Sequence, residues 1–250
     1  MLDITILKTK HSGESEARKI LPYVQSSDAF SLEIFNPIMT EDKLTFKEEE
    51  WAELIGSGTS RSKFSASLDN MFTSFGDPEG PAYLRKVFDY LFRNKTPLYH
   101  AERWKEYQQI KEIYDFWISG NEIISRGLEL LNDGDFELGS RLYFRGGELH
   151  SRHRVMRDKN VAQNLPKAEE FLRSAYPKLA SKDKIALCVQ VGASHKPELY
   201  IPQETKVINL VEDREFGFWD IPEVDNMMRN NPDYKSFRLL LSKGKYKPSI

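Results

Sequence analysis

A nearly continuous apolar run, Ile185–Val191, is interrupted only by Gln190. A run of this length, rich in β-branched residues, is typical of a strand buried on both faces, as in parallel sheets. Four further runs have a similar strand-like character: Ile4–Thr9, Ala29–Glu33, Thr96–Arg103 and Lys206–Val211. Together these runs predict a central, mainly parallel sheet.

Helical periodicity fills most of the chain between these runs. The segment Ser12–Ser26 predicts an amphipathic helix, with Ile20 and Val24 on one face. Pro22 lies inside it, so we expect a kink or an early end near Leu21. With the first two strands, this helix makes a βαβ unit whose strands are parallel.

A large helical insertion is expected after the second strand, over roughly residues 36–95 and 104–140. Helical spacing is clearest over Tyr107–Leu131, and another long helical pattern runs from Leu142 to about Tyr176. The predicted fold is therefore α/β, a mainly parallel sheet flanked by helices. No linker divides the 250 residues, so we expect a single domain over 1–250.

Polar residues suited to chemistry follow the ends of the apolar runs. They are His11, Glu33, the neighbours Glu102 and Arg103, and finally His195, which follows Gly192. Parallel strands bring their carboxyl ends to one edge, where α/β proteins bind ligands, so we expect these residues to converge in a crevice. Two histidines and two carboxylates suit a divalent cation or general acid/base catalysis. For the His195 motif alone, a simple turn after a core strand explains the pattern equally well.

A charged cluster lies on the long helical pattern that precedes the Ile185–Val191 run. Arg154, Arg157 and Asp158 fall at helical spacings on roughly one side. A solvated charged face is the usual explanation for such a cluster. The alternative is that the arginines face the crevice and either stabilise an anion there or form an ion pair with a crevice carboxylate.

Five short motifs, in this order, resemble a superfamily that groups TraB and PrgY-like proteins, the Wnt-cleaving TIKI proteases, erythromycin esterases and ChaN-like proteins. The motifs are Lys8–His11 with Glu14 after it, Glu33, Glu102–Arg103, Arg157–Leu165 and Gly192–His195. The superfamily patterns are Gly-Thr-x-His, a strand-final Glu, acidic-Arg, Arg-Asp/Asn-x-x-Met-Ala-x-Asn-Leu and Gly-x-x-His. Lys8 stands in place of the glycine in the first pattern, and Val161 in place of the methionine in the fourth.

The resemblance spans residues 4 to 210, most of the chain, and implies the same α/β fold. Known members of the superfamily include hydrolases, a haem-binding protein and regulatory proteins. Membership of this fold therefore does not determine the reaction.

The leading hypothesis is a hydrolase of ester, lactone or peptide bonds, acting on a small-molecule or peptide substrate. The predicted catalytic residues are His11, Glu33, Glu102, Arg103, Arg157 and His195. The predicted substrate contacts are Glu14, Arg154, Asp158 and Gly192. A histidine–glutamate pair can activate water, and an arginine can stabilise the oxyanion. A divalent metal is the alternative activator, held by His11, Glu33 and His195.

The second hypothesis is a non-catalytic regulatory protein that binds a ligand or haem. Aromatic side chains would then build its pocket: Tyr99, Trp104, Trp117 and Tyr143. A histidine or a tyrosine would ligate haem iron. A Soret band favours this hypothesis, whereas ester or peptide turnover favours the enzyme.

Composition narrows the class of partner. Net charge is −2, which argues against general nucleic-acid binding, and 40% hydrophobic with 30% charged residues is typical of a globular protein with a sizeable core. No segment approaches the ~20 apolar residues needed to cross a membrane, and nothing resembles a signal peptide. The single cysteine, Cys188, forms no disulfide within the chain. We expect a cytoplasmic protein without nucleic-acid or membrane partners.

Overall fold

The structure is a computed structural model, and it describes residues 1–10, 13–33, 48–56, 79–104, 106–202, 204–211 and 218–243. The described residues form two compact units. Unit 1 takes those within Met1–Phe35, Thr45–Arg103 and Asn160–Val211, and unit 2 those within Trp104–Lys159 and Glu212–Ile250. Each unit has an apolar core of its own. The expectation of a single domain stays a prediction.

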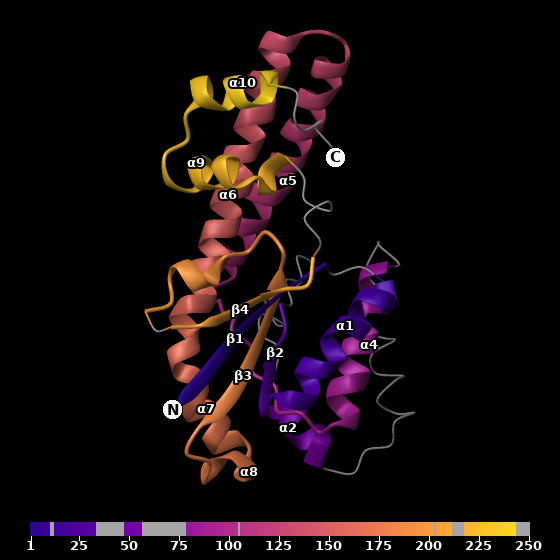
Figure 1. The fold of residues 1–250 in the computed structure, drawn as a ribbon, viewed down its shortest axis with the longest axis vertical. Coiled ribbons are helices and arrows are strands. Elements are labelled where there is room, and N and C mark those ends of the chain that lie inside the picture. Colours follow the sequence, from indigo (N-terminus) through magenta and orange to yellow (C-terminus); the bar gives the residue numbers. More distant parts are fainter. Residues whose placement is uncertain are drawn as a thin grey trace. The chain divides into compact units, whose positions relative to one another are not determined.

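Unit 1 contains an all-parallel sheet of four strands, in the order β2-β3-β1-β4 (Figure 1). The strands are β1 (Leu2–Thr9), β2 (Ala29–Ser31), β3 (Ile185–Gly192) and β4 (Lys206–Asn209). In β3 every residue from Leu187 to Val191 is buried, as its apolar pattern predicts. The predicted α/β class with a parallel sheet flanked by helices is confirmed.

The register of the sheet brings the carboxyl ends of its strands to one edge. Thr9, the last residue of β1, pairs with Gly192, the last residue of β3. Ser31, the last residue of β2, pairs with Val189. The segments that follow β1, β2 and β3 therefore all leave the sheet at the same edge.

The described part of unit 1 contains five whole helices. They are α1 (Gly13–Ser26), α2 (Glu48–Gly56), α4 (Glu79–Arg93), α7 (Ala168–Ala175) and α8 (Pro177–Ala180). Figure 1 shows α1 and α4 side by side, and they bury Ile20 and Val87 in the same core. The early end expected near Leu21 is wrong, because α1 continues through Pro22 to Ser26, while the alternative of a kink stays a prediction. Proline has no N–H group to bond the carbonyl four residues before it in the helix. Because Pro22 is exposed, water can bond that carbonyl instead.

The expected strand over Thr96–Arg103 is also wrong, because it is reduced to one parallel bridge between Phe30 and Leu98. Proline at position 97 has no N–H group to give to a ladder. Side chains bond the neighbouring backbone instead, and Tyr176 Oη lies 3.1 Å from both the N and the O atom of Leu98. The segment still lies beside β2, since Ala101 N donates to Ser31 Oγ at 3.1 Å.

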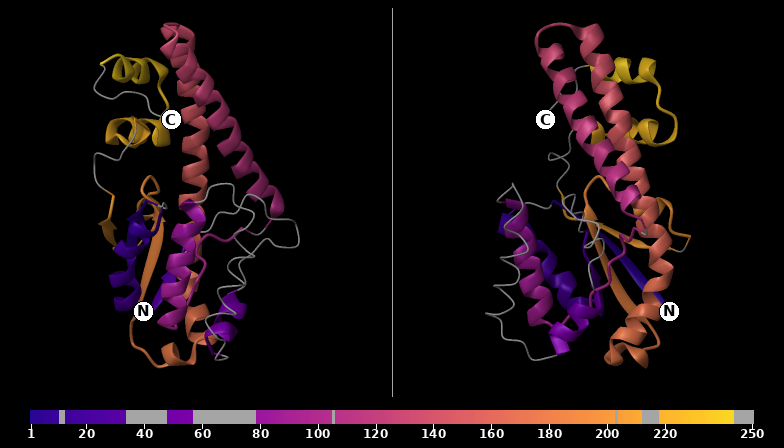
Figure 2. Two further views of the ribbon diagram at one scale, coloured as in Figure 1. Left: turned by 90° about the vertical axis from the view of Figure 1, so that its right-hand side faces the viewer. Right: turned by 180° about the vertical axis from the view of Figure 1, so that it is seen from behind.

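Unit 2 is helical. Its helices are α5 (Tyr107–Asn132), the part of α6 (Phe136–Asn164) before Asn160, α9 (Pro222–Asn230) and α10 (Tyr234–Ser242). Figure 2 shows α5 and α6 as a hairpin. The two helices approach closely at Gly127, where an added Cβ atom would lie only 2.6 Å from Tyr143 N. With α2 and α4, this hairpin lies between β2 and β3 in the sequence, as a helical insertion after the second strand requires.

Among the described residues, short 3-10 helices connect the elements of unit 1 at Leu165–Lys167 and at Pro197–Leu199. A third, Phe218–Asp220, precedes α9 in unit 2. Within the described part of the chain, no helix has both the length and the apolar character needed to span a bilayer.

Candidate functional site

Glu33 and His195 meet at the carboxyl edge of the sheet. Glu33 lies two residues beyond β2, and His195 lies three residues beyond β3. Because β2 and β3 pair in parallel, both loops leave at the same edge. His195 Nε2 is 3.3 Å from Glu33 Oε1, and the two side chains are 9% and 10% exposed. This is a mostly buried pair of an imidazole and a carboxylate.

Gly192 completes the local geometry. Its backbone N–H donates to Oε2 of Glu33, the carboxylate oxygen not facing His195. Its carbonyl accepts from the backbone N–H of His195 at 3.0 Å, which closes the turn after β3. A Cβ atom at position 192 would lie 3.4 Å from both Glu33 Oε2 and His195 Cδ2. The glycine thus lets the carboxylate and the imidazole pack closely against the end of the strand.

The loop that carries His195 is fastened to β1 by an ion pair. Lys8 Nζ is 2.5 Å from Glu198 Oε1, and these side chains are 10% and 18% exposed. Lys8 occupies the position of the glycine in the motif that the sequence resembles, and its side chain has a structural role here. It fixes the segment beyond His195 against the sheet.

A buried chain of neutral hydrogen bonds lies under the same edge. Gln190 Nε2 donates to Thr9 Oγ1 at 2.8 Å, and Thr9 Oγ1 is 3.2 Å from Tyr83 Oη. All three side chains are buried. Burial raises the pKa of Tyr83, and the negative charge of Glu33 raises it as well. Tyr83 therefore stays neutral near pH 7, and the charge of Glu33 is one of the causes of its raised pKa.

Glu102 and Arg103 follow the segment that runs beside β2. Glu102 is buried. The Arg103 guanidinium lies over the rings of Tyr99 and Phe171, with its carbon 4.9 and 5.3 Å from their centroids, and its Nε donates to the His100 carbonyl at 3.1 Å. Burial lowers the pKa of Arg103. Packing on two aromatic rings and the hydrogen bond to His100 both position this guanidinium.

Two asparagines hold the backbone of this segment. Asn160 Nδ2 and Asn164 Nδ2 donate to the Arg103 carbonyl at 2.6 and 3.2 Å. The carbonyl of Asn164 accepts from Tyr99 Oη at 2.7 Å. These bonds fix the point where the chain leaves unit 1.

Arg154 and Asp158 belong to a buried ion cluster within unit 2. Asp158 Oδ2 is 2.7 Å from Arg229 Nη1, and Arg229 Nε is 2.8 Å from Asp225 Oδ1. Arg154 Nη1 is 3.7 Å from the same Asp225 oxygen. Burial by itself would lower the pKa of Arg229, but the charges of Asp158 and Asp225 raise it. This cluster joins α6 to α9.

The remaining predicted residues are found in separate places. Arg157 is buried on α6 in unit 2. Glu14, on α1, is 56% exposed, and its Oε2 lies 3.5 Å from Lys86 Nζ on α4. His11 lies outside the described residues.

The predicted metal site is represented by two of its three ligands, Glu33 and His195. No group of three or more His, Cys, Asp or Glu side chains able to hold a metal occurs among the described residues. Both oxygens of Glu33 already lie against protein groups, namely His195 Nε2 and the Gly192 N–H. The described residues therefore do not compose the metal site, which stays a prediction.

The aromatic residues proposed for a haem or ligand pocket do not share one core. Tyr99 is buried in the core of unit 1. Tyr143 belongs to unit 2, where its ring centroid is 4.6 Å from that of Trp219 and 5.8 Å from that of Phe218. Trp104 and Trp117 also belong to unit 2. Haem binding stays a prediction.

Several residues around these sites were not singled out from the sequence. Gln190 left a signal, since it is the only polar residue in the apolar run of β3. Asn164 also left one, because it matches the asparagine of the superfamily helix pattern. Asp225 and Arg229 have the i,i+4 spacing of a helical ion pair, but nothing in the sequence links them to Asp158.

No family model matches the chain, and no curated protein or solved structure is similar enough to count as a match. The superfamily resemblance therefore rests on the motifs alone.

Proposed function

We propose that this protein is a hydrolase of ester, lactone or peptide bonds that uses His195 as the general base and Glu33 as its partner. The carrying observation is the 3.3 Å approach of His195 Nε2 to Glu33 Oε1 at the carboxyl edge of a parallel sheet. Ligands of α/β proteins bind at this edge. The resemblance to a superfamily that contains hydrolases supports the same reaction class.

The chemistry follows from the pair. A carboxylate that accepts a hydrogen bond from one imidazole nitrogen fixes the tautomer and stabilises the imidazolium form. With Nε2 directed at Glu33, Nδ1 is the nitrogen that takes a proton from water. The resulting hydroxide attacks the substrate carbonyl, and the imidazolium returns the proton to the leaving group. Arg103, which belongs to the same unit as the pair, remains the proposed stabiliser of the oxyanion.

The surroundings of the pair support this assignment. The Gly192 N–H holds the second oxygen of Glu33, so the carboxylate has a fixed orientation. The Lys8–Glu198 ion pair fastens the loop beyond His195. Catalytic groups work best when neighbouring contacts hold them in place before substrate arrives.

The test is steady-state hydrolysis of a panel of nitrophenyl esters, lactones and peptides by the wild type and by His195→Ala. Removal of the general base should lower turnover by about 10²- to 10⁴-fold. The circular dichroism spectrum and melting temperature should stay near those of the wild type. Glu33→Gln should also lower turnover and shift its pH profile, because the imidazolium loses its charged partner.

His150→Gln in unit 2 is the matched control, since it removes a histidine outside this site and should leave turnover unchanged. Equal turnover by His195→Ala and wild type would refute the proposal. So would unfolding of His195→Ala, which would make His195 a core residue. A panel without turnover, together with a Soret band when haem is added, would favour the binding protein.

A further inference from the structure

A second polar site lies at the opposite end of β2 from Glu33. A pocket of about 340 Å³ opens there, lined by residues from the ends of α1 and α4 and from α8 with the turn after it. Asp28, immediately before β2, is part of its lining, whereas Glu33 follows the same strand. The pocket is therefore separate from the Glu33–His195 pair. Its volume is within the range of small-molecule sites.

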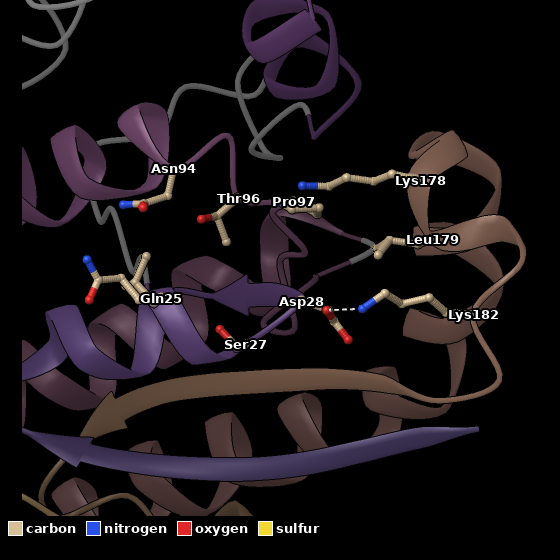
Figure 3. Close-up of a pocket in the computed structure, with 10 residues that line it drawn as sticks. Gln25, Ser27, Asp28, Asn94, Thr96, Pro97, Lys178, Leu179 and Lys182 are labelled. Carbon is tan, nitrogen blue, oxygen red and sulfur yellow. Dashed lines mark hydrogen bonds and ion pairs between the residues drawn. The ribbon is translucent and has the colours of Figure 1, made fainter.

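Asp28 anchors one of two lysines in the lining. Lys182 Nζ is 2.6 Å from Asp28 Oδ1, and Asp28 Oδ2 accepts from the Ala186 N–H at 3.0 Å. Burial would raise the pKa of Asp28, but the hydrogen bonds from Lys182 and Ala186 lower it overall. Asp28 is thus ionised and held by protein donors, and it fixes the position of the Lys182 ammonium (Figure 3).

The second lysine, Lys178, is held by a neutral group. Its Nζ donates to the Lys95 carbonyl at 2.9 Å. Among the described residues, no carboxylate forms an ion pair with Lys178, and this one bond leaves two of its three N–H donors for a ligand. Burial lowers the pKa of Lys178, as do the charges of Lys182 and Lys95, while Asp28 raises it. Positive charge therefore exceeds negative charge around the pocket.

The acceptor of Lys178 has an unusual backbone. Lys95 has φ of +48°, the left-handed conformation that usually requires glycine. It follows α4, where Thr96 N bonds Leu91 O and Lys95 N bonds Phe92 O, the pattern of a Schellman helix end. This turn points the Lys95 carbonyl at Lys178, so the position of the ammonium is built into the end of α4.

The opposite side of the pocket carries neutral polar groups. Figure 3 shows Lys178 and Lys182 reaching in from one side, with Gln25, Asn94 and Thr96 on the other. Amide and hydroxyl groups suit the polar remainder of a ligand whose anionic end is held by the lysines.

We propose that this pocket binds a small molecule through an oxyanion group, a carboxylate or a phosphate, held by the ammonium groups of Lys178 and Lys182. The alternative is that Lys178 only caps the carbonyl end of α4, a common role for a lysine at a helix C-terminus. The two differ in whether an anion binds, because a cap needs none.

The test is calorimetric titration of the full chain at low ionic strength with two probes, inorganic phosphate and succinate. The probe that binds more tightly identifies the anionic group. Lys178→Gln should weaken binding by about tenfold or more, because it removes a charge-assisted contact. Lys184→Gln is the matched control, since Lys184 is 50% exposed, pairs with Asp3 and does not line the pocket. The affinity of the Lys184→Gln variant for either probe should stay within about twofold of the wild-type affinity.

Gln25→Glu provides a second variant if Lys178→Gln fails to fold. It places a carboxylate at the exposed rim of the pocket. Repulsion from this carboxylate should weaken the binding of phosphate or succinate by a similar factor. No saturation by either probe up to about 20 mM would overturn the proposal, leaving Lys178 as a helix cap. Equal weakening by Lys178→Gln and Lys184→Gln would also overturn it, because the attraction would then be diffuse.

Discussion

The Glu33–His195 pair of unit 1 and the Arg229 cluster of unit 2 give their buried carboxylates different partners. In unit 1, His195 faces the carboxylate of Glu33. In unit 2, the buried carboxylates of Asp158 and Asp225 face Arg229, while His150 is close enough to Arg154 to be affected by its charge. A guanidinium keeps its proton at every accessible pH, whereas an imidazole exchanges one near neutrality.

This difference separates a pair suited to proton transfer from a cluster suited to holding helices together. The Arg229 cluster is a set of fixed charges, each neutralised by the next, and it links α6 to α9. The Glu33–His195 pair contains one group that can change charge during a reaction. Three measurements test this difference between the two sites.

The largest effect is expected for Arg229→Met. This change leaves the carboxylates of Asp158 and Asp225, which are 1% and 2% exposed, without their main cation. Breaking a buried pair by removing one partner costs about 3–5 kcal/mol in the free energy of unfolding. Urea unfolding followed by circular dichroism measures this loss.

Arg238→Met is the control for this prediction. Arg238 pairs with Glu137 at 2.9 Å, but their side chains are 46% and 48% exposed, so the loss should be below about 1 kcal/mol. Adding Asp158→Asn to Arg229→Met should recover part of the stability, because one buried charge disappears. Equal losses of unfolding free energy for Arg229→Met and Arg238→Met would contradict the prediction that the buried cluster stabilises unit 2.

An intermediate effect is expected from the pH dependence of stability. Burial, together with the charge of Arg154, lowers the pKa of His150 from its ordinary value of 6.5 to about 4. Between these values the folded state binds fewer protons than the unfolded state, so stability falls as pH falls. Linkage gives a loss of about 2 kcal/mol between pH 8 and pH 5.

His150→Gln removes this titration, so its stability should fall less over the same pH interval. Parallel urea titrations of the two proteins measure the difference. If both proteins lose the same stability between these pH values, another group is responsible.

The smallest effect is expected for Tyr83→Phe in unit 1. The change removes a neutral hydroxyl 3.2 Å from Thr9 Oγ1, while Gln190 continues to donate to that oxygen. The expected loss is about 1 kcal/mol. Tyr23→Phe is the control, because the Tyr23 hydroxyl bonds no described residue, and should leave the unfolding midpoint in urea unchanged. A loss above about 3 kcal/mol would show that this neutral chain is as critical as the ion cluster.

The sheet and its polar edge could be predicted because they depend on local pattern. Apolar runs identified β1, β2, β3 and β4, and parallel pairing then implied that Glu33 and His195 leave at one edge. The structure brings these two side chains together. Their prediction required no knowledge of how helices pack.

The segment 96–103 and the Arg229 cluster could not be predicted in the same way. The first has strand-like composition, but Pro97 has no N–H group for a ladder, and the Tyr176 hydroxyl bonds the backbone of Leu98 in place of a second strand. The second joins residues 71 positions apart, and only the packing of α9 against α6 shows that Asp158 is balanced. Charge on a helix face does not reveal whether its partner is solvent or another helix.

The order of strands in the sheet has a consequence for synthesis on the ribosome. In the described part of the chain, β1 pairs with β3 and with β4. The strand with which β2 pairs is β3. Ribosomes add residues from the N-terminus, so β1 and β2 emerge long before Ile185–Gly192 exists to receive them. The helices α5 and α6 are complete by then. Two apolar segments therefore stay unpaired while the residues between Ser31 and Ile185 are added, in a nascent chain that chaperones or early helix packing must protect from aggregation.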